Sequence, residues 1–135
     1  MFLFQKKIFF VAYKTSGGDF SGEITYDRAD INEGAGFDKQ TGKFRAPEGG
    51  TYYFTFSGMS GKKKSVINVG VHKEGSVQHL IVEGNEADYW NNINSSWMMV
   101  LAKGEEVYLK VSYGKLYAHS RVPVIFTGNL LKLDD

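Results

Sequence analysis

Short segments that alternate apolar and polar residues recur along this chain and restrict it to a β-rich fold. In the segment 50–57, the aromatic residues at even-numbered positions share one face of an extended chain, whereas Tyr53 lies on the other face among threonines and a serine. In the segment 106–113, the odd-numbered positions are apolar. A period of two over such lengths predicts strands with one face in a core.

Further segments of this kind bring the expected number of strands to about ten. Glycine punctuates the chain, with 16 glycines against 2 prolines, and turn-rich stretches separate the segments. The further candidate strands are 8–15, 24–27, 43–46, 66–73, 76–83, 96–102 and 123–133. About ten short strands in a chain of 135 residues predict an all-β sandwich or barrel.

Two periodicities compete in the segment 86–101. Large apolar residues recur from Trp90 to Leu101 at a spacing that would suit an amphipathic helix. The segment also carries several asparagines and serines, whose side chains compete for backbone hydrogen bonds and disfavour a helix. We therefore expect a polar loop that leads into the strand 96–102.

The length and charge of the chain restrict its partners. A chain of 135 residues suits one ordinary domain, and we expect a globular domain over 8–135 after an N-terminal segment, 1–7. Sixteen basic and 15 acidic residues give a net charge of +1, which creates no overall field to collect nucleic acid. The absence of cysteine excludes disulfides and a cysteine-based zinc site. Lys6 and Lys7 split the apolar opening residues, so no membrane insertion and no visible leader are expected.

The segment 32–54 carries the most specific pattern in the chain. It reads NEGAGFDKQTGKFRAPEGGTYYF, which places an aromatic-Asp pair, Thr-Gly, Phe, Pro and Gly-x-Tyr-x-Phe in a fixed order. Less specific parts of the same pattern lie in the segments 10–12, 101–109 and 126–131. Together these residues resemble the globular head of the complement C1q family, and the resemblance spans almost the whole chain.

The resemblance implies a C1q/TNF-like jelly-roll sandwich of about ten antiparallel strands that packs as a homotrimer. It also implies a secreted, extracellular protein whose leader has been removed, with no enzymatic activity and no required cofactor. Such heads recognise carbohydrates, microbial surfaces or protein receptors, and the fold does not fix which. No Gly-X-Y repeat occurs in the chain, which leaves assembly beyond a trimer open.

The leading hypothesis is a trimeric recognition module of innate immunity, in which threefold repetition strengthens weak sites. A trimeric secreted signalling ligand for a cell-surface receptor is the nearest alternative. A monomeric β-barrel carrier of an apolar ligand also suits the length and the 15% aromatic content. The mass in solution separates the carrier from the trimers.

Two loops supply candidate ligand-binding residues. The loop with Lys62, Lys63 and Lys64 would attract anionic glycans if three copies converged. The stretch 83–92 combines carboxylates, amides and aromatic rings, which suits sugar binding by Asp88, Tyr89 and Trp90. The oxygen ligands that calcium prefers are offered there by Glu83, Asp88 and Asn91, and some trimers of the family that this chain resembles hold calcium in the corresponding loop.

Other candidate positions follow from residue type. Asn94 begins an Asn-Ser-Ser glycosylation motif, which has meaning only in a secreted chain. Phe10, Tyr53 and Trp97 are large aromatic residues that we place at the trimer interface. His72 and His79 could face each other across a hairpin as a weak metal-binding pair. The sequence carries no catalytic motif that we recognise.

Overall fold

Eleven strands and no helix make up the described part of the chain, which comprises residues 6–61, 66–84 and 90–135 of a computed structural model. The strands are β1 (Phe9–Lys14), β2 (Gly18–Glu23), β3 (Arg28–Glu33), β4 (Phe37–Asp38), β5 (Lys43–Arg45), β6 (Gly50–Met59), β7 (Ile67–Lys73), β8 (Ser76–Glu83), β9 (Asn92–Leu101), β10 (Glu106–Ala118) and β11 (Val124–Leu133). All pairings between these strands are antiparallel. The all-β jelly-roll fold is confirmed.

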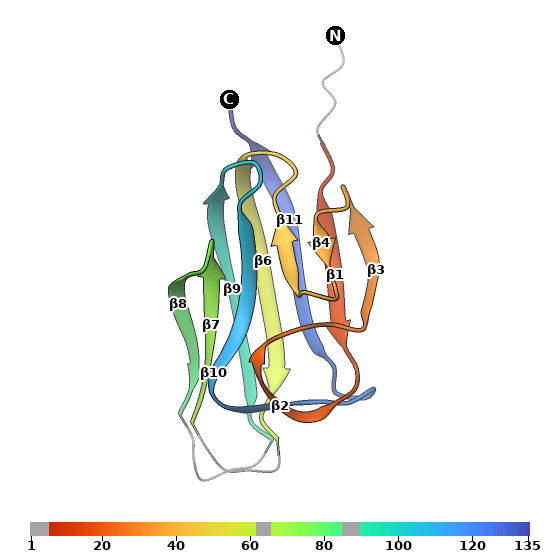
Figure 1. The fold of residues 1–135 in the computed structure, drawn as a ribbon, viewed down its shortest axis with the longest axis vertical. Helices are drawn as coiled ribbons and strands as arrows, with labels where there is room; N and C mark the ends of the chain where they lie inside the picture. Colours follow the sequence, from red (N-terminus) through yellow and green to blue (C-terminus); the bar gives the residue numbers. More distant parts are fainter. Residues whose placement is uncertain (1–5, 62–65, 85–89) are drawn as a thin grey trace.

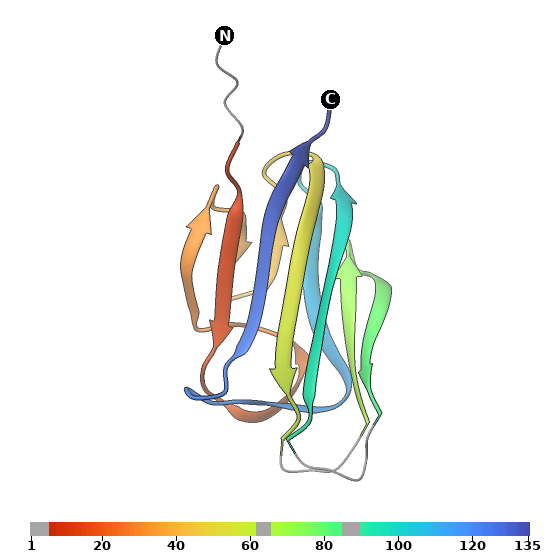
Figure 2. The same ribbon diagram turned by 180° about the vertical axis from the view of Figure 1, so that it is seen from behind.

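The strands form two sheets that pack face to face (Figure 1). One sheet has five strands in the order β3-β1-β11-β6-β9, and Figure 2 shows it from outside. The other has the order β4-β5-β10-β7-β8, with β2 paired to β10 as its sixth strand. Chain neighbours such as β1 and β2 therefore lie in different sheets, which is typical of a jelly roll.

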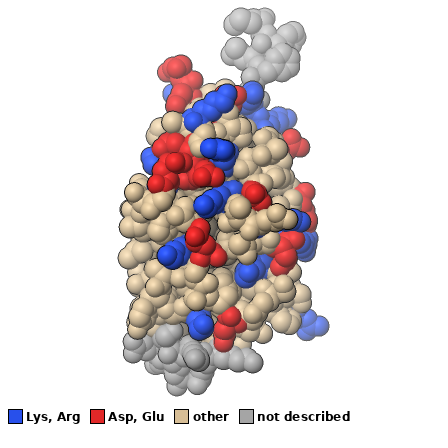
Figure 3. Space-filling view, viewed as in Figure 1, with Lys and Arg blue, Asp and Glu red and all other residues tan. Residues whose placement is uncertain are grey.

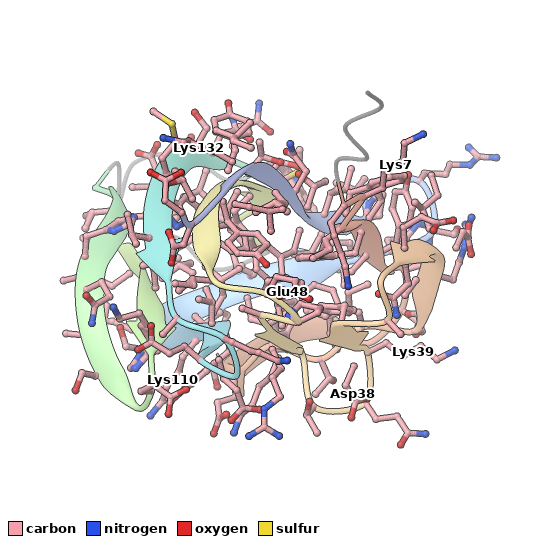
Figure 4. All side chains as sticks on the ribbon, turned by 90° about the horizontal axis from the view of Figure 1, so that it is seen from above. Lys7, Asp38, Lys39, Glu48, Lys110 and Lys132 are labelled. Atoms are coloured by element: carbon pink, nitrogen blue, oxygen red, sulfur yellow. The ribbon has the colours of Figure 1, made fainter. Side chains whose placement is uncertain are left out.

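Aromatic rings fill the space between the sheets (Figure 4). The ring of Phe10 lies 4.5 Å from that of Phe37, 5.1 Å from that of Phe44 and 5.0 Å from that of Phe126. These inward residues alternate with outward ones along each strand, so the period-two prediction for 50–57 and 106–113 is confirmed. The rings pack against one another in this core, and the carrier hypothesis stays a prediction.

Two strand predictions were wrong. The segment 24–27 is not a strand, because Ile24 and Tyr26 point into the core from the connection between β2 and β3. The strand expected to begin at 96 begins at Asn92, because its polar side chains point outward while its backbone pairs with β6. The helical alternative for this segment is excluded from Asn92 onward.

The predicted turn between Asp38 and Gly42 is present. The backbone N–H of Gly42 donates to the carbonyl of Asp38 at 2.8 Å, and Gly42 has a φ of +75°. A side chain there would collide with the carbonyl oxygen of Ile24, because a Cβ would lie 1.8 Å from it. Glycine is therefore required both by the turn and by the neighbouring chain.

Phe10 does not lie on the surface where we expected it. Its side chain is 1% exposed within a single chain, because it points between the sheets. A neighbouring subunit could not reach it, so the predicted role of Phe10 in the trimer interface is corrected to a role in the core.

We expect Phe10→Ala to lower the free energy of unfolding by about 3–5 kcal/mol, because it would leave a cavity among several rings. Urea unfolding at a fixed protein concentration measures this change. Tyr113→Ala is the matched control, because Tyr113 is 61% exposed and its loss should change stability by at most about 0.5 kcal/mol. Equal stability of the two variants would contradict the assignment of Phe10 to the core.

Candidate functional site

The outer face of the five-stranded sheet carries almost no charge. Four of its strands, β1, β11, β6 and β9, contain only two charged residues, Lys14 and Lys132, both near strand ends, in a chain that is 23% charged. A sheet face in contact with water normally carries polar and charged side chains. The near-absence of charge from four adjacent strands therefore distinguishes this face from an ordinary solvent-exposed sheet face.

The register aligns the outward side chains of these strands in rows. Phe9 lies beside Asn129, which lies beside Tyr53, which lies beside Met98. We call this surface the uncharged face, and Lys132 borders it near the end of β11, beside Thr51. Its outward residues are Phe9, Val11, Thr51, Tyr53, Thr55, Ser57, Asn94, Ser96, Met98, Val100, Ile125, Thr127 and Asn129.

The uncharged face has an apolar half and a hydroxyl-rich half. Met98 is 66% and Val100 64% exposed, and exposed apolar side chains of this size are unusual when they adjoin one another. Toward the other end of the face, the hydroxyls of Thr55 and Thr127 share a hydrogen bond. Away from Lys132 at the border, neither half contains an ion that would lose its water on being covered.

The charged rim of the uncharged face lies on the edge strand β3. There the guanidinium of Arg28 donates to the carboxylate of Asp30, and this hydrogen bond lowers the pKa of Asp30 below its ordinary value. Arg28 also lies over the ring of Tyr13, 5.0 Å from its centroid. Exposed pairs of this kind contribute little stability. Because β3 carries these charged residues, it marks where the uncharged surface ends.

The face of the six-stranded sheet differs in charge. Figure 3 shows acidic and basic side chains interspersed over this side of the molecule. Lys110 and Asp38 lie on its outside in the end-on view (Figure 4). An ion pair joins Lys73 to Glu105 at 3.8 Å. This face therefore has the charge pattern of a surface in contact with water.

A cleft of about 340 Å³ opens beside the hydroxyl-rich half. Its walls are Ser57, Gly58, Met59, Asn92, Asn94, Arg121, Val122 and Pro123. Asn94 is exposed and lies beside Ser57 on the uncharged face. A glycan on Asn94 would cover this part of the face, so glycosylation there and a protein contact over it exclude each other.

The structure places the predicted interface aromatics on two different sides of the sheet. Tyr53 points outward on the uncharged face. Trp97 points inward, with its ring 5.7 Å from that of Phe54. The residues that sequence reasoning missed are Phe9, Met98 and Val100, and the signal that could have found them is the absence of charge from four separate segments.

Most of the predicted loop sites lie outside the described residues. These are Lys62, Lys63, Lys64, Asp88 and Tyr89. Trp90 is described and is 45% exposed. The calcium site expected from Glu83, Asp88 and Asn91 stays a prediction, and the described residues contain no group of three or more side chains that could hold a metal ion.

The prediction that His72 and His79 face each other is wrong. His79 lies beside the buried Val71 and faces inward, 5.2 Å from the ring of Trp97. His72 faces outward and stacks on Tyr108 at 4.9 Å. A shift in the register between Val71 and His72 does not change this arrangement, because the two imidazoles remain on opposite faces of one sheet.

Known proteins of one family match most of this chain. A sequence model of the C1q domain matches residues 8–131. Complement C1q tumor necrosis factor-related protein 3 of Mus musculus is 30% identical over 108 residues, which cover 80% of this chain and 44% of that protein. Human Multimerin-1 is 31% identical over 134 residues, which cover 90% of this chain and 10% of that protein. The chain thus spans less than half the length of these curated relatives.

Solved structures share the fold at lower sequence identity. The globular domain of zebrafish complement 1qA protein has a TM-score of 0.76 and 17% identity, with 95% of this chain and 99% of that chain covered. Murine APRIL at pH 5.0 has a TM-score of 0.71 and 16% identity, with 91% and 99% covered. In the part of the chain that the structure describes, no helix is long and apolar enough to cross a membrane.

We expect Met98→Glu to keep the β-sheet circular dichroism spectrum and cooperative unfolding, because Met98 points away from the core. Trp97→Glu is the matched variant at the next residue and should lose cooperative unfolding, because it places a carboxylate against Phe54. Loss of the fold in Met98→Glu alone would show that the two faces of β9 are assigned the wrong way round.

Proposed function

Since this chain belongs to the C1q domain family, we propose that it is a non-enzymatic, secreted recognition module that assembles as a homotrimer through the uncharged face. The single observation that carries the assembly is the uncharged face over β1, β11, β6 and β9, where Lys132 at the border is the one charged outward residue. Full burial of an apolar side chain such as Met98 or Val100 contributes about 1.5–3 kcal/mol. Several such side chains per contact offset the entropy lost on association.

A second apolar surface lies on the outer side of the six-stranded sheet and favours a closed ring. Strand β8 lies at the edge of the six-stranded sheet, and its outward residues Val77, Leu80 and Val82 are about half exposed. β8 also lies next to β9, the edge strand of the other sheet. A contact between this edge in one copy and the uncharged face in the next joins unlike surfaces, and such contacts close into rings when the rotation permits.

Recognition in a trimer depends on repetition of a weak site. Three copies at fixed spacing raise the avidity for a repetitive surface, such as a microbial glycan layer, far above that of one site. The C1q-related names of the relatives support binding rather than catalysis as the activity. A trimeric ligand for a cell-surface receptor would use the same assembly, and glycan and receptor binding assays distinguish the two.

We expect light scattering at micromolar concentration to give three times the 15.1 kDa chain mass. Met98→Glu should shift the mass toward one chain, because it buries an unpaired carboxylate at the contact. Tyr113→Glu is the control, because it adds the same charge to an exposed site on the other sheet. A single-chain mass for the unmodified protein would refute the proposed assembly, and repetition with a calcium chelator tests for structural calcium.

The assembly should resist salt. The outward residues named for the uncharged face carry no charge and Lys132 lies only at its border, so screening has little attraction to weaken there. We expect the trimer mass to persist as sodium chloride rises from about 0.05 to 1 M. Dissociation at high salt would instead show that charged residues outside this face hold the subunits together.

A further inference from the structure

An exposed aromatic cluster lies apart from the uncharged face. β9 begins, and β10 bends across, the end of the sandwich opposite to the end of β11 (Figures 1 and 2). There the ring of Trp90 meets that of Tyr117 at 5.1 Å and nearly at a right angle, 84°. The ring of His119 lies 6.3 Å from that of Tyr117 and parallel to it. We call Trp90, Tyr117, His119 and the neighbouring Asp19 the aromatic corner.

The backbone holds the aromatic corner in place. Ser60 donates its N–H to the carbonyl of Asn91 at 2.8 Å, and its hydroxyl accepts the N–H of Asn91 at 2.7 Å. Ser60 also forms an isolated bridge with Leu116, the residue before Tyr117. The two segments that carry the rings are thereby both hydrogen-bonded or paired to one buried serine. Trp90 itself has a φ of +60°, which is uncommon for a large residue and is associated with functional positions.

Asp19 completes the corner on the side of β2. It is the cross-strand partner of Tyr117 in the pairing of β2 with β10. Its carboxylate also lies against Gly61, where a Cβ would approach the Asp19 oxygen to 1.8 Å. Position 61 therefore has to be glycine while the carboxylate occupies this place beside Tyr117.

The corner offers polar groups that the described part of the chain leaves without a hydrogen bond. Within the described residues, no hydrogen bond is made by the indole N–H of Trp90, the hydroxyl of Tyr117 or the carboxylate of Asp19. His119 accepts the N–H of Arg121 at Nδ1, which leaves Nε2 as its second polar atom. Aromatic faces are thus bordered by both donors and acceptors.

We propose that the aromatic corner binds a neutral sugar ring, with the apolar face of the ring on Trp90 and Tyr117 and its hydroxyls on Asp19 and His119. Each sugar hydroxyl both donates and accepts, so it can use the carboxylate as well as the free N–H and O–H groups. A quaternary ammonium also favours aromatic walls, but it would leave the donors of the corner unused. This inference rests on the proposed recognition function and names its ligand class.

The test uses tri-N-acetylchitotriose, a neutral oligosaccharide with broad apolar ring faces, and follows tryptophan fluorescence and saturation-transfer NMR. We expect weak binding, which Tyr117→Ala weakens about tenfold or more because it removes one wall. Tyr113→Ala is the matched control on the same strand and should bind as the unmodified protein does. Asp19→Asn should also weaken binding, since it keeps the shape but loses the charge that strengthens hydrogen bonds.

Three results would overturn the inference: no binding of tri-N-acetylchitotriose, cellotriose or mannotriose, equal binding by Tyr117→Ala and Tyr113→Ala, or binding of choline in place of the sugars. Light scattering on the same samples keeps the two proposals separate. A trimer that binds none of these sugars would refute the sugar site alone. A single-chain protein whose sugar binding depends on Tyr117 would refute the assembly alone.

Discussion

The close packing of Phe10 and Phe54 over Gly128 is the contact on which the rest of the structure depends. Gly128 of β11 pairs with Phe10 of β1 on one side and with Phe54 of β6 on the other. A Cβ at Gly128 would lie 2.5 Å from the ring of Phe10 and 2.8 Å from that of Phe54, so only glycine admits both rings. Trp97 then extends the same inward row onto β9.

That inward row decides which residues face outward, because side chains alternate strictly along a strand. With Phe10 and Phe54 inside, Phe9 and Tyr53 must lie outside, and Met98 joins them on β9. The uncharged face is therefore the reverse side of the core. The proposed subunit contact and the proposed sugar site occupy different parts of the molecule, which lets an assembled protein keep its aromatic corner exposed.

Much of the fold could be predicted from the sequence, and the failures have physical causes. The alternation around Tyr53 was clear because its flanking aromatics need burial, whereas β2 and β3 were missed because their outward residues are polar on an exposed edge. Phe10 was misplaced because residue type alone cannot tell a core from a contact. Trp90 was predicted as a sugar-binding residue, but its contact with Tyr117 could not be foreseen, because the two segments are joined through the pairing of Ser60 with Asn91 and Leu116.

The structure of β9 bears on how this chain can vary. Its last residues, 97–101, are apolar at every position, although only alternate ones reach the core of their own chain. A monomer would tolerate polar residues at 98 and 100, because both side chains would face water. An oligomer that buries this face would tolerate them at neither position. The residues found at 98 and 100 in a relative should therefore indicate whether that relative assembles through this strand. Polar residues there would be expected in a monomer and apolar residues in an oligomer.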